Sequence, residues 1–531
     1  MVFVKSINDL IKRCPMSGKI VGVIAPTRQD AFWFRIIGFF ALLWFALRVI
    51  PKPSRAGYPC QRVAMPLALS FLAWLSGITG LAYLLKRIKT KTLPVRTILI
   101  ISLVLAGFTG GYFAFSNHQF FFSKVEEGFK HADESNQPIG TAKGIMPGRV
   151  AWVHDPSAIT YNGKGFWWED RYNDQEKIND MVSSAILSLA DSRDEKSSWD
   201  KLFRSFNKEK GKGDIGYQIC QKIAIKINQN NSNKQENNNN INTSPQLMYA
   251  VVKQLIEKAG VPPNNITVFD ASRVITNNVY EKLKGKNGFP DINMVDHYGG
   301  NGRLQATYVK DAIPFSLPHG ISKDLAECMV EADYVINLAV LKGHGGQGVT
   351  LCGKNYYGTT GIDVYPKNNR HDYFNQDQSG KPGYLTFVDF MAHKDMGEKT
   401  ILFFIDGLYG CKTVGGPPNL KWKMDPFNDA WPSSIFASQD SVAIDSVGID
   451  FLANEFPDAR DLNYCDQYLH ESALITKPAS KIVYDPEKDG KPVTKSLGVH
   501  EHWNNPLEKK YSRNLSKDGS GIDLIYIYLS K

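Results

Sequence analysis

The pattern of apolar and polar positions divides the chain into two parts. Three long apolar runs, at about residues 31–50, 63–85 and 95–115, are separated by short basic loops. Each run approaches the ~20 residues that an α-helix needs to cross a bilayer. We therefore predict a membrane anchor of three transmembrane helices over residues 1–125, followed by a polar tether over residues 126–147. Buried core helices are the alternative, which three such runs in succession disfavour.

From residue 148 onward, short apolar segments alternate with segments of helical periodicity. Short strands of this kind are typical of a parallel sheet whose two faces are both covered by helices. Residues 148–531 are therefore predicted to form one α/β domain, with a mainly parallel sheet and helices on both faces. The predicted strands lie at 148–156 (with its turn), 222–227, 265–269, 292–296, 334–341, 400–405 and 433–437, and the predicted helices at 174–189, 244–259, 274–283, 322–331, 383–393 and 441–453.

An asparagine-rich tract interrupts this pattern at residues 228–243. Asparagine and serine side chains bury little apolar surface, so a segment of this composition cannot form a packed core. We predict an insertion that lies on the surface as a loop or is disordered.

The distribution of charge supports the division into two parts. The whole chain has a net charge of +9, but residues 1–125 contain 16 Lys and Arg and only 2 Asp and Glu. The rest of the chain contains 46 basic and 51 acidic residues, so the domain itself is mildly acidic. A nucleic-acid-binding protein needs a basic patch on its folded domain, and we therefore expect no nucleic-acid partner.

The basic residues of the anchor also predict its orientation. They are more numerous before the first apolar run and around the loop between the second and third runs than between the first and second. Because basic loops remain in the cytoplasm, we predict a cytoplasmic N-terminus and an extracytoplasmic domain. In a bacterium this is an integral inner-membrane protein with a large periplasmic domain, and the lipid bilayer is its expected partner.

The seven cysteines are scattered along the chain and include no CxxC pair. Iron–sulfur clusters and zinc ribbons require closely spaced cysteines, so we expect neither. Any other cofactor is left open by the sequence.

Several predicted strands end in charged residues. In an open α/β sheet the carboxyl ends of the strands line the ligand crevice. One strand leads into Lys342 and His344, and two others lead into Asp155 and Asp406. A histidine at this place can move a proton near neutral pH, and a lysine can bind a carboxylate or phosphate. We predict His344, Lys342 and Asp406 as catalytic residues and Asp155 as a ligand-binding residue.

The turn after this strand is rich in glycine. Residues 343–348 fit the pattern GxGxxG, and a helix is predicted to begin at Val349. A strand, a glycine-rich turn and a helix N-terminus can bind a phosphate through backbone N–H groups. The turn lacks the context of a dinucleotide motif, which follows the first strand, so a plain flexible turn is the alternative. The further predicted ligand-binding residues are Gly345, Gly346, Gly348, Lys354 and Asn355.

The C-terminal region contains the pair His500 and His502. Residues two apart in a strand point to the same face, so both imidazoles can reach one divalent metal ion. We predict these two histidines as metal ligands, with Asp155, His154 or Asp406 as further ligands.

A resemblance to a known family rests on residues 335–342, 348–355, 404–408, 437–448 and 500–505, together with His344. These segments resemble a family of uncharacterised bacterial and archaeal proteins called domain of unknown function 362, over most of residues 145–530. The resemblance implies no activity. Some relatives carry a ferredoxin-like iron–sulfur module, which implies redox chemistry for those members, but this chain lacks the cysteine pattern.

These features predict a membrane-anchored extracytoplasmic enzyme that acts on a small anionic or carbonyl-bearing ligand, with redox-linked chemistry as one option. The alternative is a non-catalytic binding or assembly module of a membrane-associated complex. A closed polar crevice would favour the enzyme, whereas a large exposed apolar face would favour the module.

Overall fold

The computed structural model of the chain describes residues 134–317, 322–345, 348–360, 383–459, 462, 465–516 and 519–529, and short segments at 11–13, 20–23, 39–40 and 42–44. The chain divides into two compact units, Met1–Glu127 and Gly128–Lys531. In the first unit, the strands β1 (Ile11–Arg13) and β2 (Ile20–Val23) form an antiparallel pair.

Within the residues that the structure describes, no helix is long and apolar enough to cross a bilayer. The longest of these helices has 16 residues, fewer than the ~20 that a membrane span requires. This finding contradicts two predictions: a fold class in which three transmembrane helices precede the sheet, and an integral-membrane localisation. The predicted spans at 31–50, 63–85 and 95–115 themselves fall outside the described residues, apart from a few positions between 39 and 44.

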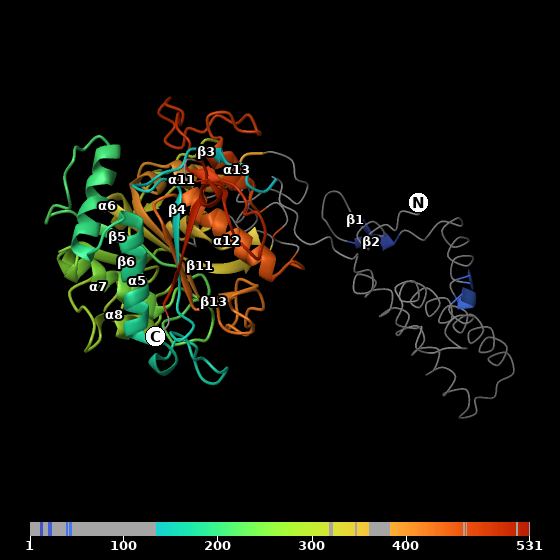
Figure 1. The fold of residues 1–531 in the computed structure, drawn as a ribbon, viewed down its shortest axis with the longest axis horizontal. Coiled ribbons are helices and arrows are strands. Elements are labelled where there is room, and N and C mark those ends of the chain that lie inside the picture. The colour runs from blue at the N-terminus through green and yellow to red at the C-terminus, as the bar shows by residue number, and fades with distance from the viewer. Residues whose placement is uncertain are drawn as a thin grey trace. The chain divides into compact units, whose positions relative to one another are not determined.

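The second unit is built on one large sheet (Figure 1). Its strands follow the order β16–β4–β14–β13–β11–β5–β6–β7–β8, and the short β12 pairs with the end of β11. Neighbours along this order are parallel except at β14, which is antiparallel to both β13 and β4. The prediction of a mainly parallel α/β sheet is confirmed.

The strands of this sheet are β4 (Arg149–His154), β5 (Ile223–Lys226), β6 (Ile266–Asp270), β7 (Asn293–Asp296), β8 (Leu304–Gln305), β11 (Tyr334–His344), β12 (Gly348–Val349), β13 (Thr400–Cys411), β14 (Ser434–Ser438) and β16 (Asp523–Tyr528). Two short antiparallel pairs lie beside it, β3 (Ile139–Gly140) with β15 (Val499–His500) and β9 (Tyr308–Val309) with β10 (Leu325–Ala326). The helix predicted over residues 322–331 is shorter than expected, because its first residues pair as β10.

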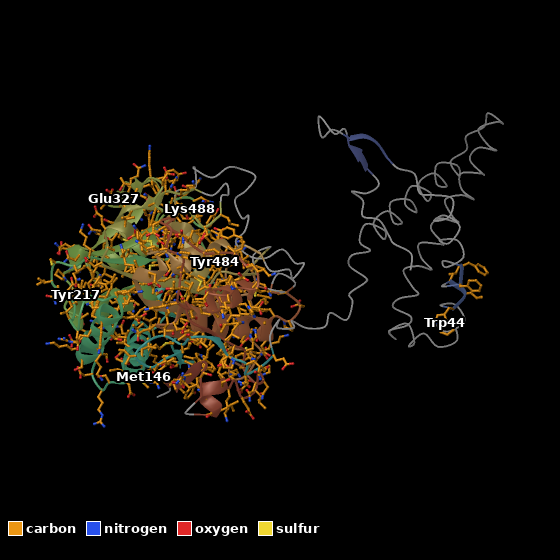
Figure 2. The ribbon with its side chains drawn as sticks, turned by 90° about the horizontal axis from the view of Figure 1, so that it is seen from above. Trp44, Met146, Tyr217, Glu327, Tyr484 and Lys488 are labelled. Atoms are coloured by element: carbon orange, nitrogen blue, oxygen red, sulfur yellow. The ribbon has the colours of Figure 1, made fainter. Side chains whose placement is uncertain are left out.

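Helices cover both faces of the sheet, and a separate hydrophobic cluster lies on each face (Figure 1). Side chains of β11 alternate between the two clusters: Ile336 and Leu338 belong to one, and Val335 and Ala339 to the other. Side chains fill the space on both faces (Figure 2). The helices are α5 (Gln175–Ala190), α6 (Glu195–Glu209), α7 (Pro245–Glu257), α8 (Asn277–Lys284), α9 (Glu327–Val330), α10 (Cys352–Asn355), α11 (Thr386–Ala392), α12 (Ser441–Glu455), α13 (Gln467–Ala473) and α14 (Ser512–Leu515).

The asparagine-rich tract at 228–243 is a loop, but only its residues 233–234 and 236–237 are exposed. It connects β5 to α7, and several of its polar side chains are buried, Asn242 among them. The Asn231 side chain donates hydrogen bonds to the carbonyl oxygens of Ile241 and Val414, at 2.8 and 2.6 Å. Amide side chains and backbone groups satisfy one another here, so the tract packs through hydrogen bonds rather than through apolar contacts.

Helix α10 has only four residues and is held in place by a neighbouring helix. The backbone N–H groups of Cys352 and Gly353 donate to the Asp445 carboxylate on α12, each at 2.8 Å. The Tyr468 hydroxyl donates to the same carboxylate at 2.8 Å. Asp445 lies on α12 and therefore caps a different helix, α10, by accepting hydrogen bonds from its first N–H groups.

We predict that the substitution Asp445→Ala lowers the free energy of unfolding by about 2–4 kcal/mol, because it leaves three buried donors without their acceptor. Urea denaturation of the full chain measures this loss. Asp180→Ala on the exposed side of α5 is the control, and should change the free energy by less than ~0.5 kcal/mol. Equal effects of the two substitutions would contradict the capping role.

Candidate functional site

Charged side chains from two neighbouring strands meet at the carboxyl edge of the sheet. Lys226 is the last residue of β5 and Asp270 the last residue of β6, and both are buried. The Lys226 ammonium nitrogen lies 3.3 Å from a carboxylate oxygen of Asp270. Gly358 lies directly on this pair, because a Cβ atom at that position would be 2.7 Å from the Lys226 nitrogen. A larger residue at position 358 would therefore disturb the pair.

Asn355 on α10 links this pair to the central strand. Its side-chain oxygen accepts from Lys226 and from Asn228, both at 3.3 Å. Its side-chain nitrogen donates to Asn337 Oδ1 at 2.8 Å and to the Leu338 carbonyl at 3.2 Å. Asn355 was predicted as a ligand-binding residue, and the structure places it at the centre of a buried hydrogen-bond network.

Lys354 differs from the other buried lysines of this edge. Its side chain is buried, and among the residues that the structure describes its ammonium group makes no hydrogen bond or ion pair. Its charged end lies 5.5 Å from the centre of the Tyr357 ring. Burial, together with the positive charges of Arg273 and Lys226, lowers the pKa of Lys354 to about 7. The group can therefore gain or lose a proton near neutral pH.

Three basic side chains lie around α10 among the residues that the structure describes. Arg273 lowers the pKa of both Lys226 and Lys354, Lys226 also lowers that of Lys354, and Asp270 is the carboxylate that pairs with Lys226. The oxygens of Asp270 already accept hydrogen bonds from the backbone N–H groups of Gln229 and Ser272, at 2.9 and 3.1 Å. We call Lys226, Lys354 and Arg273 the cationic cluster.

Some buried polar atoms next to the cationic cluster have no hydrogen-bond partner within the described part of the chain. They are Oδ1 of Asn228 and Nε2 of Gln229. Buried polar groups are usually satisfied, so such atoms mark places where a ligand or water can bind.

Lys342 and Asp406 were predicted as catalytic residues, and both are buried at this edge. The Lys342 ammonium donates to Asn230 Oδ1 at 2.7 Å and to the Ile241 carbonyl at 2.9 Å. The Asp406 carboxylate accepts from the backbone N–H of Ser244 at 2.6 Å. Both side chains therefore anchor the loop between β5 and α7, and their role in catalysis stays a prediction.

The same burial shifts the ionisation of both groups toward neutral pH. Burial lowers the pKa of Lys342 to about 7, although nearby Cys411 and Asp406 act in the opposite direction. Burial raises the pKa of Asp406 to about 6.

The glycine-rich turn is a hairpin and not the strand–turn–helix of a phosphate-binding loop. β11 continues through His344 and pairs antiparallel with β12, so that His344 lies opposite Gly348. Gly348 has a positive φ of 80°, which suits glycine in such a turn. The next helix begins at Cys352 and not at Val349 as predicted. The hairpin therefore separates the glycines from the helix N-terminus.

The other predicted residues of the turn are His344, Gly345 and Gly346. Gly345 is exposed, and Gly346 lies outside the described residues. The His344 ring is half-buried, with Nδ1 2.9 Å from the carbonyl oxygen of Gly345. The proton-transfer role of His344 stays a prediction.

Asp155 lies at the end of β4, which β14 and β13 separate from β11 in the sheet. Its carboxylate accepts from the backbone N–H of Ser157 at 2.9 Å and so shapes the turn after the strand. A surface pocket of about 430 Å³ begins at this turn and is lined partly by Asp170 and Lys282. Asp155 thus belongs to a different part of the carboxyl edge from the cationic cluster.

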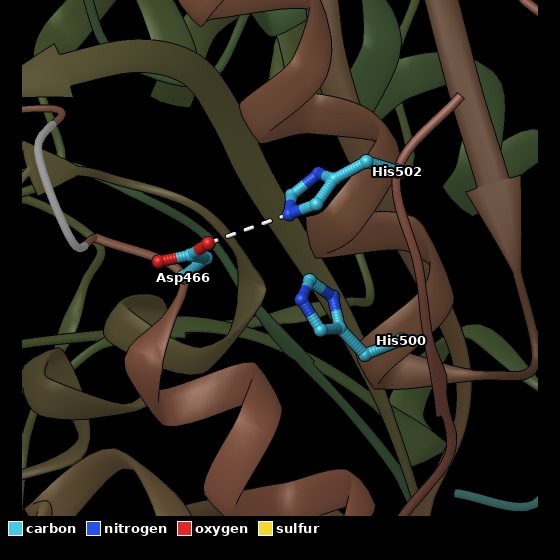
Figure 3. A group of neighbouring side chains, drawn as sticks. All are labelled: Asp466, His500 and His502. Atoms are coloured by element: carbon cyan, nitrogen blue, oxygen red, sulfur yellow. Dashed lines mark ion pairs between the residues drawn. The ribbon is translucent and has the colours of Figure 1, made fainter. Parts of the chain in front are cut away.

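His500 and His502 come together with Asp466 rather than with the predicted Asp155, His154 or Asp406. The three side chains are buried, and their ligand atoms lie within 4.8 Å of one another (Figure 3). Burial opposes ionisation of His502, but Asp450 and then Asp466 raise its pKa to about 10.

The fold and the site define a class of protein: an α/β domain whose parallel strands end in a buried, cation-rich cluster. Residues 223–450 match the model of a family described as Domain of unknown function (DUF362), in agreement with the resemblance found in the sequence. The matched region includes Lys226, Lys354 and Asp406 but neither His500 nor His502. No curated protein and no solved structure matches the chain.

Sequence reasoning missed three residues that complete these groups: Lys226, Arg273 and Asp466. Lys226 is a lysine inside an otherwise apolar strand, and that local signal could have identified it. Arg273 lies three residues after Asp270, the last residue of β6. Asp466 is 34 residues from His500, and no spacing in the sequence connects the two.

We predict that Lys354→Met raises the free energy of unfolding at pH 7 by on the order of 1–3 kcal/mol. The folded pKa near 7 lies below the ordinary lysine value, so the folded state releases a proton that the unfolded chain keeps. The destabilisation of the folded state by the buried charge of Lys354 is therefore fully present below about pH 7, and it disappears as the pH rises toward 10.5. Urea denaturation at pH 7 and pH 9 should show a smaller gain at pH 9.

The control for this substitution is Lys196→Met on the exposed side of α6. It removes the same charge but should leave the pH dependence of stability as in the parent. If Lys354→Met and Lys196→Met behave alike at both pH values, Lys354 is not a buried, uncompensated cation.

We predict that Lys342→Met opens the loop between β5 and α7 locally. The lysine bonds two distant points of the loop, Asn230 and Ile241, so its loss should raise amide hydrogen exchange at Ser232 and Thr243 by about tenfold. Lys399→Met is the control, because Lys399 also donates to a backbone carbonyl, that of Val330, at 2.8 Å. Unchanged amide hydrogen exchange at Ser232 and Thr243 in Lys342→Met would contradict the anchoring role.

Proposed function

We propose that the domain binds a small anionic ligand, a carboxylate or a phosphate, at the cationic cluster of Lys226, Lys354 and Arg273. The observation that supports the proposal most strongly is the buried side chain of Lys354, whose ammonium group has no hydrogen bond or ion pair among the described residues. An ionised group removed from water without a partner costs several kcal/mol. A bound anion would offset this cost.

The other charges around α10 support an external anion rather than an internal partner for Lys354. Asp270 pairs with Lys226 and also accepts hydrogen bonds from the backbone of Gln229 and Ser272. The Asp270 oxygens therefore already have other partners. The Gln229 side-chain nitrogen is a buried donor with no acceptor in the described part of the chain, which adds a neutral hydrogen-bond donor at the same edge.

The pKa of Lys354 links binding to proton uptake. An anion beside the lysine favours its charged form and raises its pKa from about 7. Binding of a permanently charged anion should therefore strengthen as the pH falls from 8 to 6. A lysine that titrates near neutral pH can also act as a general acid or base toward a bound substrate. Lys354 is for this reason our first candidate for an enzymatic role, ahead of Lys342 and His344.

We predict that sulfate and small dicarboxylates raise the melting temperature of the full chain, and that Lys354→Met removes this response. Sulfate is the preferred probe because its charge does not change between pH 6 and pH 8. A ligand present at 100 times its Kd stabilises a protein by about 2.7 kcal/mol, which a thermal-shift measurement detects. Isothermal titration at pH 6 and pH 8 then gives the pH dependence of the affinity.

The control is again Lys196→Met, which lowers the net charge equally but lies on an exposed helix face. It should keep the parent response to sulfate at both pH values. A parent-like response in Lys354→Met, or no response of the parent to any of the anions, would refute the proposal.

A further inference from the structure

A second group of chemically reactive side chains lies where the C-terminal segment packs on α12 and α13. His500 is the last residue of β15, His502 follows it by two positions, and Asp466 directly precedes α13. All three are buried, with exposed fractions of 0% for each histidine and 1% for the aspartate. The two imidazole rings and the carboxylate converge from separate segments on a common centre (Figure 3).

The two histidine rings are oriented by side chains of α12. Nδ1 of His502 lies 2.7 Å from an oxygen of Asp450, and Nδ1 of His500 lies 2.8 Å from the Ser446 hydroxyl. With Nδ1 engaged in both rings, the Nε2 atoms are the ones that face Asp466, and His502 Nε2 is 3.3 Å from its carboxylate. Outer partners of this kind fix the ring orientation of histidine ligands in metal sites.

Asp450 is itself held in place, which makes the arrangement rigid. Its second oxygen accepts from the Tyr511 hydroxyl at 2.8 Å and from the backbone N–H of Trp503 at 3.1 Å. The contacts thus extend from α12 through Asp450 to His502, and on to the segment that follows it. A site built this way keeps its ligand geometry without help from a bound ion.

The charge of the group favours a cation at its centre. Two buried carboxylates, Asp450 and Asp466, lie on opposite nitrogens of the same imidazole, that of His502. Buried carboxylates require a positive partner. A proton on His502 and a metal ion at the centre would each contribute positive charge there.

We propose that Asp466, His500 and His502 bind one divalent transition-metal ion through a carboxylate oxygen and the two Nε2 atoms. The ligand atoms lie within 4.8 Å of one another, a separation that one ion can span after small side-chain movements. Two imidazoles and one carboxylate suit zinc, iron or manganese, whereas calcium and magnesium take oxygen ligands.

The burial of the three ligands assigns the ion a structural task. No ligand residue is exposed by more than 1%, so a dissolved substrate does not reach the centre in this conformation. The ion would join the C-terminal segment to the start of α13, and through Ser446 and Asp450 to α12. This site is independent of the cationic cluster, and either proposal can hold without the other.

The test is the metal content of the full chain, purified without chelators and measured by inductively coupled plasma mass spectrometry. We expect about one transition-metal ion per chain, and removal by a chelator should lower the melting temperature. Titration of the metal-free protein with Co²⁺ should produce visible absorption bands that saturate at about one equivalent. A parent protein that contains no metal and shows no Co²⁺ bands would overturn the proposal in favour of a protonated His502.

Substitutions at the proposed ligands test which residues bind the ion. His500→Gln and Asp466→Asn should lose the Co²⁺ bands, and Asp450→Asn, which removes the carboxylate that contacts His502 but none of the proposed ligands, should weaken binding by about 10- to 100-fold. His393→Gln is the control, because His393 is an equally buried histidine whose Nε2 lies 2.8 Å from the Ala312 carbonyl. Metal binding that survives in both His500→Gln and Asp466→Asn would overturn the assignment. If these variants do not fold, the measurements on the parent protein decide.

Discussion

The position of α10 depends on one buried carboxylate. A helix of four residues does not hold its conformation alone, because the first turn of a helix is costly to form. Asp445 fixes it by accepting the N–H groups of Cys352 and Gly353. This contact holds Lys354 and Asn355 over the carboxyl ends of the central strands. The cationic cluster therefore exists because α12, a separate element, supplies the cap for α10.

Burial gives Lys342 and Lys354 similar pKa values near 7, yet the two lysines do different work. The Lys342 ammonium donates hydrogen bonds to two acceptors in the loop between β5 and α7, so this lysine stabilises the loop. Lys354 has neither an acceptor nor an acidic partner among the described residues. A shifted pKa alone does not separate a structural lysine from a ligand-binding one, whereas the hydrogen bonds do.

The sequence predicted those parts of the fold that depend on local patterns. The strands β11 and β13 and the helix α12 begin at the predicted residues 334, 400 and 441, although both strands extend beyond their predicted ends. Prediction failed at the glycine-rich turn, where pairing between strands decides the outcome. The hairpin at Gly348 delays the helix expected from Val349, because residues 348–349 pair back on β11.

The same limit applies to the sites. Lys354 and Asn355 were identified because they follow a recognisable strand and turn, but the residues they meet, Lys226 and Asn337, come from other strands. The asparagine-rich tract was expected to be solvated, and its burial depends on acceptors such as Val414 that only the folded chain supplies. The apolar runs in residues 1–125 predicted membrane spans, but none of the described helices is long and apolar enough to cross a bilayer.

Helix α12 connects the two candidate sites physically. Every residue from Ser441 to Ala453 is buried, so the helix is packed on all sides and cannot rotate without breaking both hydrophobic and polar contacts. Asp445 on this helix holds α10 and thereby Lys354, whereas Asp450 holds His502. The carboxylates are five residues apart, so they leave the helix on different sides and serve different neighbours. A polar residue inside an all-buried helix needs a specific partner, and on α12 Asp445 has partners on α10 whereas Asp450 has one in His502. The helix therefore holds both sites in one rigid frame. The family match ends at Asp450, so it includes the whole cationic cluster but not the group of Asp466, His500 and His502.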